Sequence, residues 1–501
     1  MLDIKIDKDN FAYLITDDSY LFKLVEKSLT REVRKYNNWF KFYENKKVKH
    51  YSLVNNGTKI KFKAGLVQFL CNSFNKRGIR YNIEDKRNYL NISAKQAVIK
   101  LNDDVTLRYY QQQAVKSVFN SNGYGCLQLP TGSGKSEIAA SIIRTYLNYY
   151  FNRAVVYVVP TIKLQKEAKE RFESYSIPCN TELPFVIGCA NIITYASMVR
   201  AEIKTIDKDK VGALIFDESH HLKGAKSSKI IHQYKKLNAC IGLSATIAIK
   251  LSEKKYLNQL TDEDLNILGC VGYPLYIKEI EETIKEKYVT PIEIRVLDNP
   301  EDVVLTDDEM SDWHTVKKLV LMTENRANLI AKLLKQLVDK DKLNTICLLI
   351  PEVKWSQHFM MQIANIIRDK KDARFILTYG GNKYDEIVDG HLIHLNGDMI
   401  TDAENNIRDP NKLTIFSATT YFFEGINITN IQAVINVYGG RSSTRVKQQV
   451  GRAVRLFEGK EIAYIYEIWD KNPIFESQLK TRLNIYKKEY NAEIKKIKLE
   501  D

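Results

Sequence analysis

The segment Cys126-Leu-Gln-Leu-Pro-Thr-Gly-Ser-Gly-Lys135-Ser136 decides the fold class of this chain. An apolar run precedes its loop and a helix-forming run follows it, so the segment predicts a strand, a tight loop and a helix. Four small residues form the loop: Thr131, Gly132, Ser133 and Gly134. Such residues let successive backbone N–H groups surround a phosphate. Lys135 would then reach the β- and γ-phosphates of a nucleotide, and the Ser136 hydroxyl would bind Mg²⁺.

This loop departs from the strict phosphate-loop pattern, because Leu129 stands where that pattern has a glycine. The alternative interpretation is an ordinary glycine turn before a helix. The position between a strand-like run and a helix favours the phosphate loop, since the mechanism requires that context.

A second motif follows the buried run Ala213–Phe216, where Asp217 and Glu218 stand side by side. An acid pair after an apolar run is usually a solvated strand end. In the same predicted sheet as a phosphate loop, however, Asp217 can hold Mg²⁺ and Glu218 can polarise the attacking water. We therefore expect ATP and Mg²⁺ as cofactors.

The length of 501 residues predicts about three domains. Residues 1–98 have short alternating runs and turn signals, which predict a small α+β domain. Residues 99–285 and 286–501 each alternate short apolar runs with helical stretches, the pattern of an α/β domain on a parallel sheet. We expect the basic tail from Gln478 to Ile497 to be helical and to pack on the last domain.

Several protein classes are excluded by composition and patterning. No apolar run approaches the roughly 18 residues of a membrane span, and the N-terminus has no apolar signal region. Seven scattered cysteines without a CxxC pair argue against a zinc site and a disulfide framework. We expect a cytoplasmic protein, or one of the host cytoplasm if its source is a virus, with no membrane partner.

The charge points to nucleic acid. Of the net charge of +14, residues 1–100 carry +11, with 21 Lys and Arg against 10 Asp and Glu. Residues 31–64 hold ten of these cations among aromatic residues. Cations neutralise phosphates and aromatic rings stack on unpaired bases. The alternatives are that the aromatics are core, which is their more common role at this density, and that the cations form a solvated face. The candidate DNA contacts here are Trp39, Lys46, Lys47 and Lys49.

Six segments between Leu107 and Ile468 resemble the motifs of superfamily 2 helicases. They are Leu107–Gln111, Val158–Thr161, Ile193–Ser197, Ser244–Thr246, Glu424–Ile428 and Gln448–Arg455, taken with the phosphate loop and the acid pair. The resemblance implies two RecA-like parallel-sheet motor domains in tandem, with ATP between them and a small basic α+β domain in front.

The resemblance also implies roles for individual residues. Gln111 would recognise adenine with Arg108 beside it, and Ser244–Thr246 would couple hydrolysis to strand movement. Thr161 and Thr194 would hold DNA phosphates.

In the second motor domain, Gly425 would lie at the nucleotide. Arg455 would stabilise transition-state charge as an arginine finger, with Arg452 on the γ-phosphate. The fifth motif departs from the family, because Asn427 replaces its usual aspartate.

Within the superfamily the chain looks most like the phage UvsW-type branch-migration helicases, whose relatives include RecG-like remodelers and restriction-enzyme motor subunits. We expect an ATP-dependent DNA helicase or translocase that remodels forks and four-way junctions as a monomer. Two alternatives stay open: a duplex-DNA translocase of a restriction-modification system, and an ATP-gated nucleic-acid clamp that does not travel.

Overall fold

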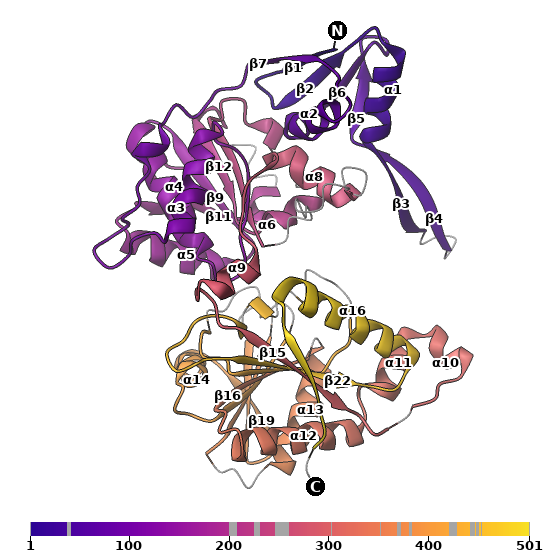
Figure 1. Ribbon diagram of the computed structural model, residues 1–501. Coiled ribbons are helices and arrows are strands. Elements are labelled where there is room, and N and C mark those ends of the chain that lie inside the picture. The colour runs from indigo at the N-terminus through magenta and orange to yellow at the C-terminus, as the bar shows by residue number, and fades with distance from the viewer. Residues whose placement is uncertain are drawn as a thin grey trace. The chain divides into compact units, whose positions relative to one another are not determined.

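The computed structural model describes residues 2–37, 42–199, 208–224, 231–245, 260–301, 303–350, 352–367, 372–379, 383–419, 428–440, 446, 450–451 and 453–499. The chain divides into two compact units (Figure 1). The first comprises Met1–Leu129 and Gly134–Lys278, and the second comprises Pro130–Ser133 and Glu279–Asp501.

The N-terminal part of the first unit is a five-stranded sheet with the order β5-β6-β2-β1-β7. Its strands and helices are β1 (Leu2–Ile6), β2 (Phe11–Ile15), α1 (Ser19–Ser28), β5 (Tyr51–Val54), β6 (Lys59–Lys63), α2 (Val67–Asn75) and β7 (Tyr81–Asp85). Strands β1, β2 and β6 alternate buried and more exposed residues because one face of the sheet packs on α1 and α2.

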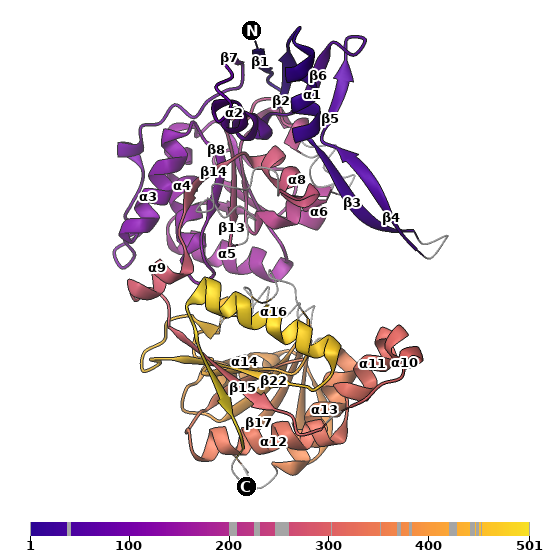
Figure 2. The same ribbon diagram turned by 45° about the vertical axis from the view of Figure 1, so that its right-hand side comes forward.

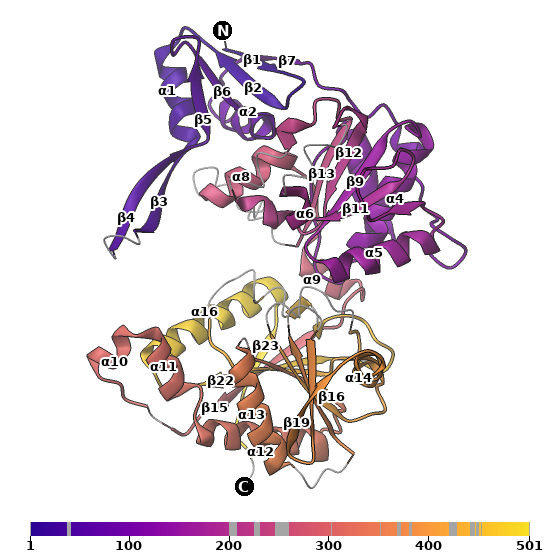
Figure 3. The ribbon, with the colours of Figure 1, turned by 180° about the vertical axis from the view of Figure 1, so that it is seen from behind.

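Between α1 and β5 the chain makes a separate two-stranded hairpin of β3 (Thr30–Asn37) and β4 (Phe42–Lys49), here called the arm. Figures 1 and 3 show the arm extending away from the five-stranded sheet. Its two strands pair only with each other among the described residues, and seven of the eleven arm side chains that the structure describes are exposed.

The rest of the first unit contains a seven-stranded parallel sheet with the order β10-β11-β9-β12-β13-β8-β14. Its elements are α3 (Tyr109–Asn120), β8 (Tyr124–Gln128), α4 (Lys135–Tyr149), β9 (Ala154–Val159), α5 (Ile162–Ser174), β10 (Cys179–Asn180), β11 (Ala190–Thr194), α6 (Tyr195–Val199), β12 (Val211–Phe216), β13 (Ala239–Ser244), α8 (Asp262–Val271) and β14 (Pro274–Ile277). Four central strands are buried along their whole length, as expected of a parallel sheet covered on both faces.

The two sheets of the first unit share one hydrophobic core. At their junction Gly65 lies so close to the end of α8 that an added Cβ would stand 2.9 Å from the Gly269 carbonyl oxygen. The N-terminal residues thus fold onto α8 instead of standing apart, and the boundary expected at residue 98 stays a prediction.

The second unit is built on a nine-stranded sheet with the order β19-β18-β17-β20-β16-β21-β22-β15-β23. Its strands are β15 (Ile292–Asp298), β16 (Thr345–Leu349), β17 (Arg374–Tyr379), β18 (Lys383–Val388), β19 (His391–Leu395), β20 (Thr414–Ala418), β21 (Ala433–Asn436), β22 (Ala463–Trp469) and β23 (Glu493–Ile497). Its helices are α9 (Ile280–Lys285), α10 (Asp307–Ser311), α11 (Trp313–Val320), α12 (Glu324–Asp339), α13 (Val353–Ile366), α14 (Asp398–Arg408) and α16 (Pro473–Tyr490). All strands are parallel except β18 and β19, which extend one edge as antiparallel strands. The predicted α/β class with two parallel sheets is confirmed.

The C-terminal tail corrects one expectation. Helix α16, which lies along β22 in Figure 2, ends at Asn491, whose φ of 48° is left-handed. Residues Glu493–Ile497 are not helical, because they pair with β15 as the parallel strand β23. Among the described residues, no helix is both long and apolar enough to cross a membrane.

Candidate active site

The phosphate loop joins β8 to α4, at the carboxyl edge of the seven-stranded sheet. Gly132 and Gly134 have φ values of +83° and +76°, a backbone conformation that favours glycine. Lys135 and Ser136 are the first two residues of α4, so the N–H groups of that helix end face the loop. Thr131 and Ser133 lie between the glycines, and Ser133 is buried.

The acid pair follows β12, two strands away from β8 in the same sheet. Lys135 Nζ lies 3.3 Å from Glu218 Oε1, and the exposed fractions of the two side chains are 10% and 24%. Because parallel strands end at one edge of the sheet, the loop after β8 and the loop after β12 meet there. The structure therefore brings together Lys135, Asp217 and Glu218.

Two partly buried carboxylates beside one ammonium group have different proton affinities. Burial and the neighbouring Glu218 charge raise the pKa of Asp217 to about 6, against the opposing effects of Lys135 and the Tyr157 hydroxyl. Burial also acts to raise the pKa of Glu218, but Lys135 and His220 outweigh it and hold that pKa below its ordinary value. Glu218 is thus the firmly ionised member of the pair.

The backbone at Glu218 is unusual, with a φ of 47° and a ψ of 54°. A non-glycine residue in the left-handed region is uncommon and costs about 1 kcal/mol or more, and such residues cluster at functional sites. The turn points the Glu218 carboxylate back toward Lys135 on one side and toward His220 Nδ1, 3.4 Å away, on the other.

The predicted adenine segment packs against the phosphate loop. Arg108 precedes α3, and its backbone N–H donates to Gln111 Oε1 over 2.8 Å. The Gln111 side chain is buried, and its Nε2 atom occupies the place that a Cβ on Gly134 would take. The amide of Gln111 is therefore fixed beside the loop.

The two predicted phosphate-binding threonines end neighbouring strands. Thr161 follows β9 and its hydroxyl oxygen accepts from the Leu164 N–H over 3.2 Å, which caps α5. Thr194 ends β11, and its hydroxyl lies 3.0 Å from Ser197 Oγ. Both hydroxyls already hydrogen-bond to the first turn of the helix that follows them. A DNA contact at either threonine would therefore also use the adjacent backbone N–H groups.

The second unit carries Arg455 two residues after the last of the helical residues 450, 451 and 453. Its carbonyl oxygen accepts from Thr290 Oγ1 over 3.3 Å. The other predicted residues of this region, Arg452 and Gly425, lie outside the described residues, as do Asn427 and Thr246.

The predicted DNA contacts of the N-terminal residues fall on the arm. The side chains of Lys46, Lys47 and Lys49 are exposed, while Trp39 lies outside the described residues. Not every residue of the basic stretch is available in this way, because Phe62 is buried in the core and Lys61 Nζ lies 4.0 Å from the centre of the Phe11 ring.

Three contributors to the site were given no role by the sequence. The Tyr195 hydroxyl donates to the Asp217 carbonyl oxygen over 2.8 Å, and Tyr157 hydrogen-bonds the Asp217 carboxylate. His220 Nδ1 lies 3.2 Å from Ser244 Oγ, so it joins the acid pair to the end of β13. The two tyrosines look like strand and helix core, and only the adjacency of His220 to Glu218 could have suggested a role.

The residues fit a nucleotide triphosphate with Mg²⁺. The loop has positive-φ glycines, and Lys135 and the acid pair lie together at the edge of the sheet where Ser136 begins α4. This donor set of hydroxyl and carboxylate oxygens is also the kind that Mg²⁺ prefers.

Comparison with known proteins agrees with this geometry. The family model described as "Type III restriction enzyme, res subunit" matches residues 104–249. The ATP-dependent DNA helicase uvsW of Enterobacteria phage T4 is 24% identical over 390 residues, covering 74% of this chain and 69% of that protein. The DNA 3'-5' translocase XPB2 of Sulfurisphaera tokodaii is 28% identical over 380 residues, covering 71% and 80%. In fold, the chain is similar to the DNA-bound type ISP restriction-modification enzyme LlaBIII, with a TM-score of 0.54 and 16% identity over 86% of this chain and 34% of that one.

The fold and the site are those of a nucleotide hydrolase of the helicase type. The resemblance to superfamily 2 is confirmed: the chain is an ATP hydrolase similar to the helicases of that superfamily, including the UvsW-type helicases.

Proposed function

We propose that this ATP hydrolase remodels branched DNA, moving forks and four-way junctions by branch migration in recombination, replication or repair. The observation that carries the proposal is the arm, a basic surface on the unit that bears the phosphate loop. It would give the protein a DNA contact in addition to the one made by the motor. A motor that only tracks along one duplex needs no such second contact, whereas a remodeler must hold one part of a junction while it moves another.

The arm has the charge and geometry for a phosphate backbone. In the antiparallel register Lys47 lies opposite Glu32 and Lys49 opposite Thr30, so these two lysines share a face with a spacing of about 6.8 Å along the strand. Lys46 lies on the other face. Exposed cations on both faces of a narrow hairpin suit an element inserted between two DNA segments.

The root of the arm supports a mechanical role. The Arg31 guanidinium donates to the Leu260 carbonyl oxygen, and His50 Nε2 lies 3.0 Å from Asp262 Oδ1 at the start of α8. Helix α8 follows the segment that begins at Ser244 and resembles the coupling motif. A displacement of α8 would therefore move the base of the arm.

For hydrolysis, we propose that Lys135 and Ser136 hold the phosphates and Mg²⁺, with Asp217 as a further Mg²⁺ ligand. Glu218 accepts the proton of the attacking water, since its carboxylate is ionised at neutral pH. Arg455, with Arg452, supplies positive charge to the transition state, as the resemblance implies. When bound, Mg²⁺ neutralises charge on the β- and γ-phosphates. Gln111 and Arg108 hold the base, and Thr131, Gly132, Ser133 and Gly134 supply the backbone cradle.

The test compares ATP hydrolysis and strand separation on matched duplex, single-stranded, forked and four-way DNA. The Lys135→Ala variant is assayed with each substrate as a control and should not hydrolyse ATP. ATP-dependent dissociation of forks and junctions, with little on blunt duplex, is the expected result. Equal action on all substrates would contradict the proposal.

A second candidate is the duplex translocase of a restriction-modification system, which the match of residues 104–249 to a restriction-enzyme subunit favours. Hydrolysis stimulated by duplex DNA without strand separation would support it. An ATP-gated clamp would fail to displace a protein bound ahead of it on the DNA, whereas either motor would succeed.

A further inference from the structure

The backbone that carries Arg455 is held by two residues from other parts of the second unit. The Thr290 N–H donates to the Val454 carbonyl oxygen over 2.7 Å, and the Thr290 hydroxyl donates to the Arg455 carbonyl oxygen over 3.3 Å. Lys460 Nζ donates to the Ala453 carbonyl oxygen over 2.9 Å. Three consecutive carbonyl oxygens are thus bound, and the last of them belongs to Arg455 itself.

Lys460 also binds the residues that follow the fifth motif. Its Nζ atom donates to the Thr429 carbonyl oxygen over 2.8 Å and to the Ile431 carbonyl oxygen over 3.3 Å. An ammonium group has three N–H donors, so the three carbonyl oxygens at Lys460 match its capacity. One side chain therefore connects the residues just after the fifth motif, which ends at Ile428, to the end of the sixth motif.

A tight turn brings Lys460 back toward the sixth motif. The Lys460 N–H donates to the Phe457 carbonyl oxygen over 3.1 Å, which closes a four-residue turn. Gly459, the third residue of this turn, has a φ of +80°, in the left-handed region that favours glycine. Because the chain reverses here, the Lys460 side chain reaches a carbonyl oxygen seven residues earlier.

The bonds at Lys460 hold one cation close to another. Lys460 is half-buried, and burial acts together with the charge of Arg455 to lower the pKa of the Lys460 ammonium below its ordinary value. Because the Coulomb energy falls with distance, this effect places the two cations near each other. The backbone carbonyl oxygens offset the repulsion, since their partial negative charges face the ammonium.

We propose that Thr290 and Lys460 are positioning residues for ATP hydrolysis: they fix the backbone from which the Arg455 side chain extends. This inference rests on the proposed role of Arg455. In the sixth motif, the bonds of Thr290 and Lys460 fall on Arg455 or within two residues of it, so loss of either would let the guanidinium shift. Lys460 further holds this backbone against the residues that follow the fifth motif.

The experiment measures steady-state ATP hydrolysis with duplex DNA, together with the thermal unfolding midpoint, for variants of the full chain. Lys460→Met keeps much of the apolar stem but removes the ammonium, whereas Lys460→Arg keeps a cation with several N–H donors. Thr290→Val removes only the hydroxyl and keeps the N–H that binds Val454. Its matched control is Thr414→Val, which removes another buried hydroxyl that donates to a backbone carbonyl oxygen, that of Asn406 over 3.4 Å.

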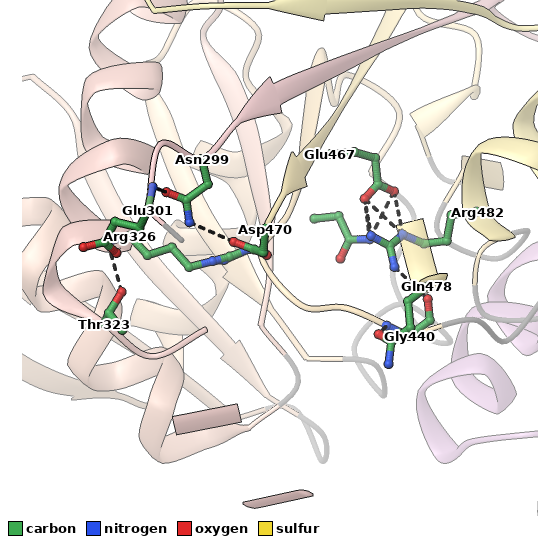
Figure 4. Close-up of polar contacts among 10 residues, drawn as sticks. Asn299, Glu301, Thr323, Arg326, Gly440, Glu467, Asp470, Gln478 and Arg482 are labelled. Carbon is green, nitrogen blue, oxygen red and sulfur yellow. Dashed lines mark hydrogen bonds and ion pairs between the residues drawn. The ribbon is translucent and has the colours of Figure 1, made fainter. Parts of the chain in front are cut away.

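A second control separates position from stability. Figure 4 shows Arg326 of α12 beside Asp470, with which it pairs over 3.0 Å, and both side chains are at most 5% exposed. Arg326→Lys weakens this buried ion pair in another part of the second unit. It should lower the unfolding midpoint while kcat stays within about twofold of the unaltered chain.

We expect Lys460→Met to lower kcat between about ten- and a hundredfold, and Thr290→Val between about three- and tenfold. KM for ATP should stay within about twofold of the unaltered chain, because a displaced catalytic group costs rate and leaves ground-state binding intact. Lys460→Arg should recover most of the lost kcat, and Thr414→Val should hydrolyse ATP normally.

The inference is overturned if Lys460→Met or Thr290→Val keeps a normal kcat, or if the two Lys460 variants lose activity alike. It is also overturned if Thr414→Val and Arg326→Lys lose kcat to the same degree as the variants at Thr290 and Lys460. Arg455→Ala distinguishes this inference from the proposed function. An active Arg455→Ala variant would refute the role of Arg455 itself, whereas an inactive one beside normal Lys460→Met and Thr290→Val variants would refute only the positioning roles.

Discussion

The contact between Lys135 and Glu218 predicts that the phosphate-loop lysine stabilises the fold as well as binding phosphate. Removing one member of a fully buried ion pair costs about 3–5 kcal/mol, because the other charge stays behind without a partner. Here Glu218 is 24% exposed, and His220 remains 3.4 Å from its other oxygen. We therefore expect Lys135→Ala to lower the free energy of unfolding by about 2–3 kcal/mol.

The double variant isolates this effect. In Lys135→Ala with Glu218→Gln no carboxylate at position 218 is left without its lysine partner, so most of the lost stability should return even though hydrolysis is absent from both variants. By differential scanning calorimetry without nucleotide, Lys135→Ala should melt about 5–10 °C below the unaltered chain. The double variant should melt at least halfway back toward it.

The result that would refute this reasoning is equal melting of the single and double variants. That outcome would mean that Glu218 is satisfied by water and His220 and that the ion pair contributes nothing to stability. Glu218→Gln alone serves as the control, because Lys135 has a long flexible chain and can turn toward solvent when its partner is neutral.

Three further predictions concern the loop, the arm and the root of the arm. Gly134→Ala should weaken binding of a fluorescent ATP analogue at least about tenfold, because the new Cβ would collide with Gln111 and stand 2.8 Å from Glu137 Oε2. Gly57→Ala has the same backbone strain at a φ of +86° with nothing within 4 Å, so equal losses in both variants would contradict the steric explanation. Changing Lys46, Lys47 and Lys49 together to Gln should weaken the binding of forked DNA. The slope of log Kd against log salt concentration, measured by fluorescence anisotropy, should fall by about 2–3. An unchanged slope would mean that the arm does not contact DNA phosphates. Burial lowers the pKa of His50 to about 4, against the opposing charge of Asp262, so the unfolded chain binds more protons than the folded one between pH 6.5 and 4. The free energy of unfolding should therefore fall across this window as the pH is lowered. Calorimetry of His50→Asn should show a shallower fall, and parallel profiles of the two proteins would contradict a lowered pKa of His50.

The sequence predicted those parts of the site whose residues lie close together along the chain. The loop from Thr131 to Ser136 and the acids after β12 need particular residue types at fixed spacing, and a strand before each of them is visible as an apolar run. Parallel strands then bring the two loops to one edge without any further information. The alternating runs and turn signals of residues 1–98 likewise correspond to local structure, for example the turn at Asn55–Gly57 and the strand at Lys59–Lys63.

The features that escaped prediction depend on contacts between residues far apart in the chain. Arg31 was counted as one of many cations, but it binds a carbonyl oxygen 229 residues away and anchors the arm. The N-terminal sheet shares a core with the parallel sheet because apolar residues on α2 and α8 pack together, a contact that no sequence pattern indicates. The tail was expected to be helical to Ile497, because Glu493–Ile497 shows no clear alternation and becomes a strand only beside β15.

The placement of β15 has a consequence for biosynthesis. Strand β15 opens the second unit, but its only neighbours among the described strands are β22 and β23, the last two of the chain. As the chain leaves the ribosome, β15 must wait with both edges unpaired until residues 463–497 have been made. During that interval residues Ile292–Leu297 have no paired strand on either side and can pair with strands of other chains. Slow translation of the second unit would lengthen this exposure, so the yield of soluble protein should depend on elongation rate and on chaperones that cover extended apolar segments.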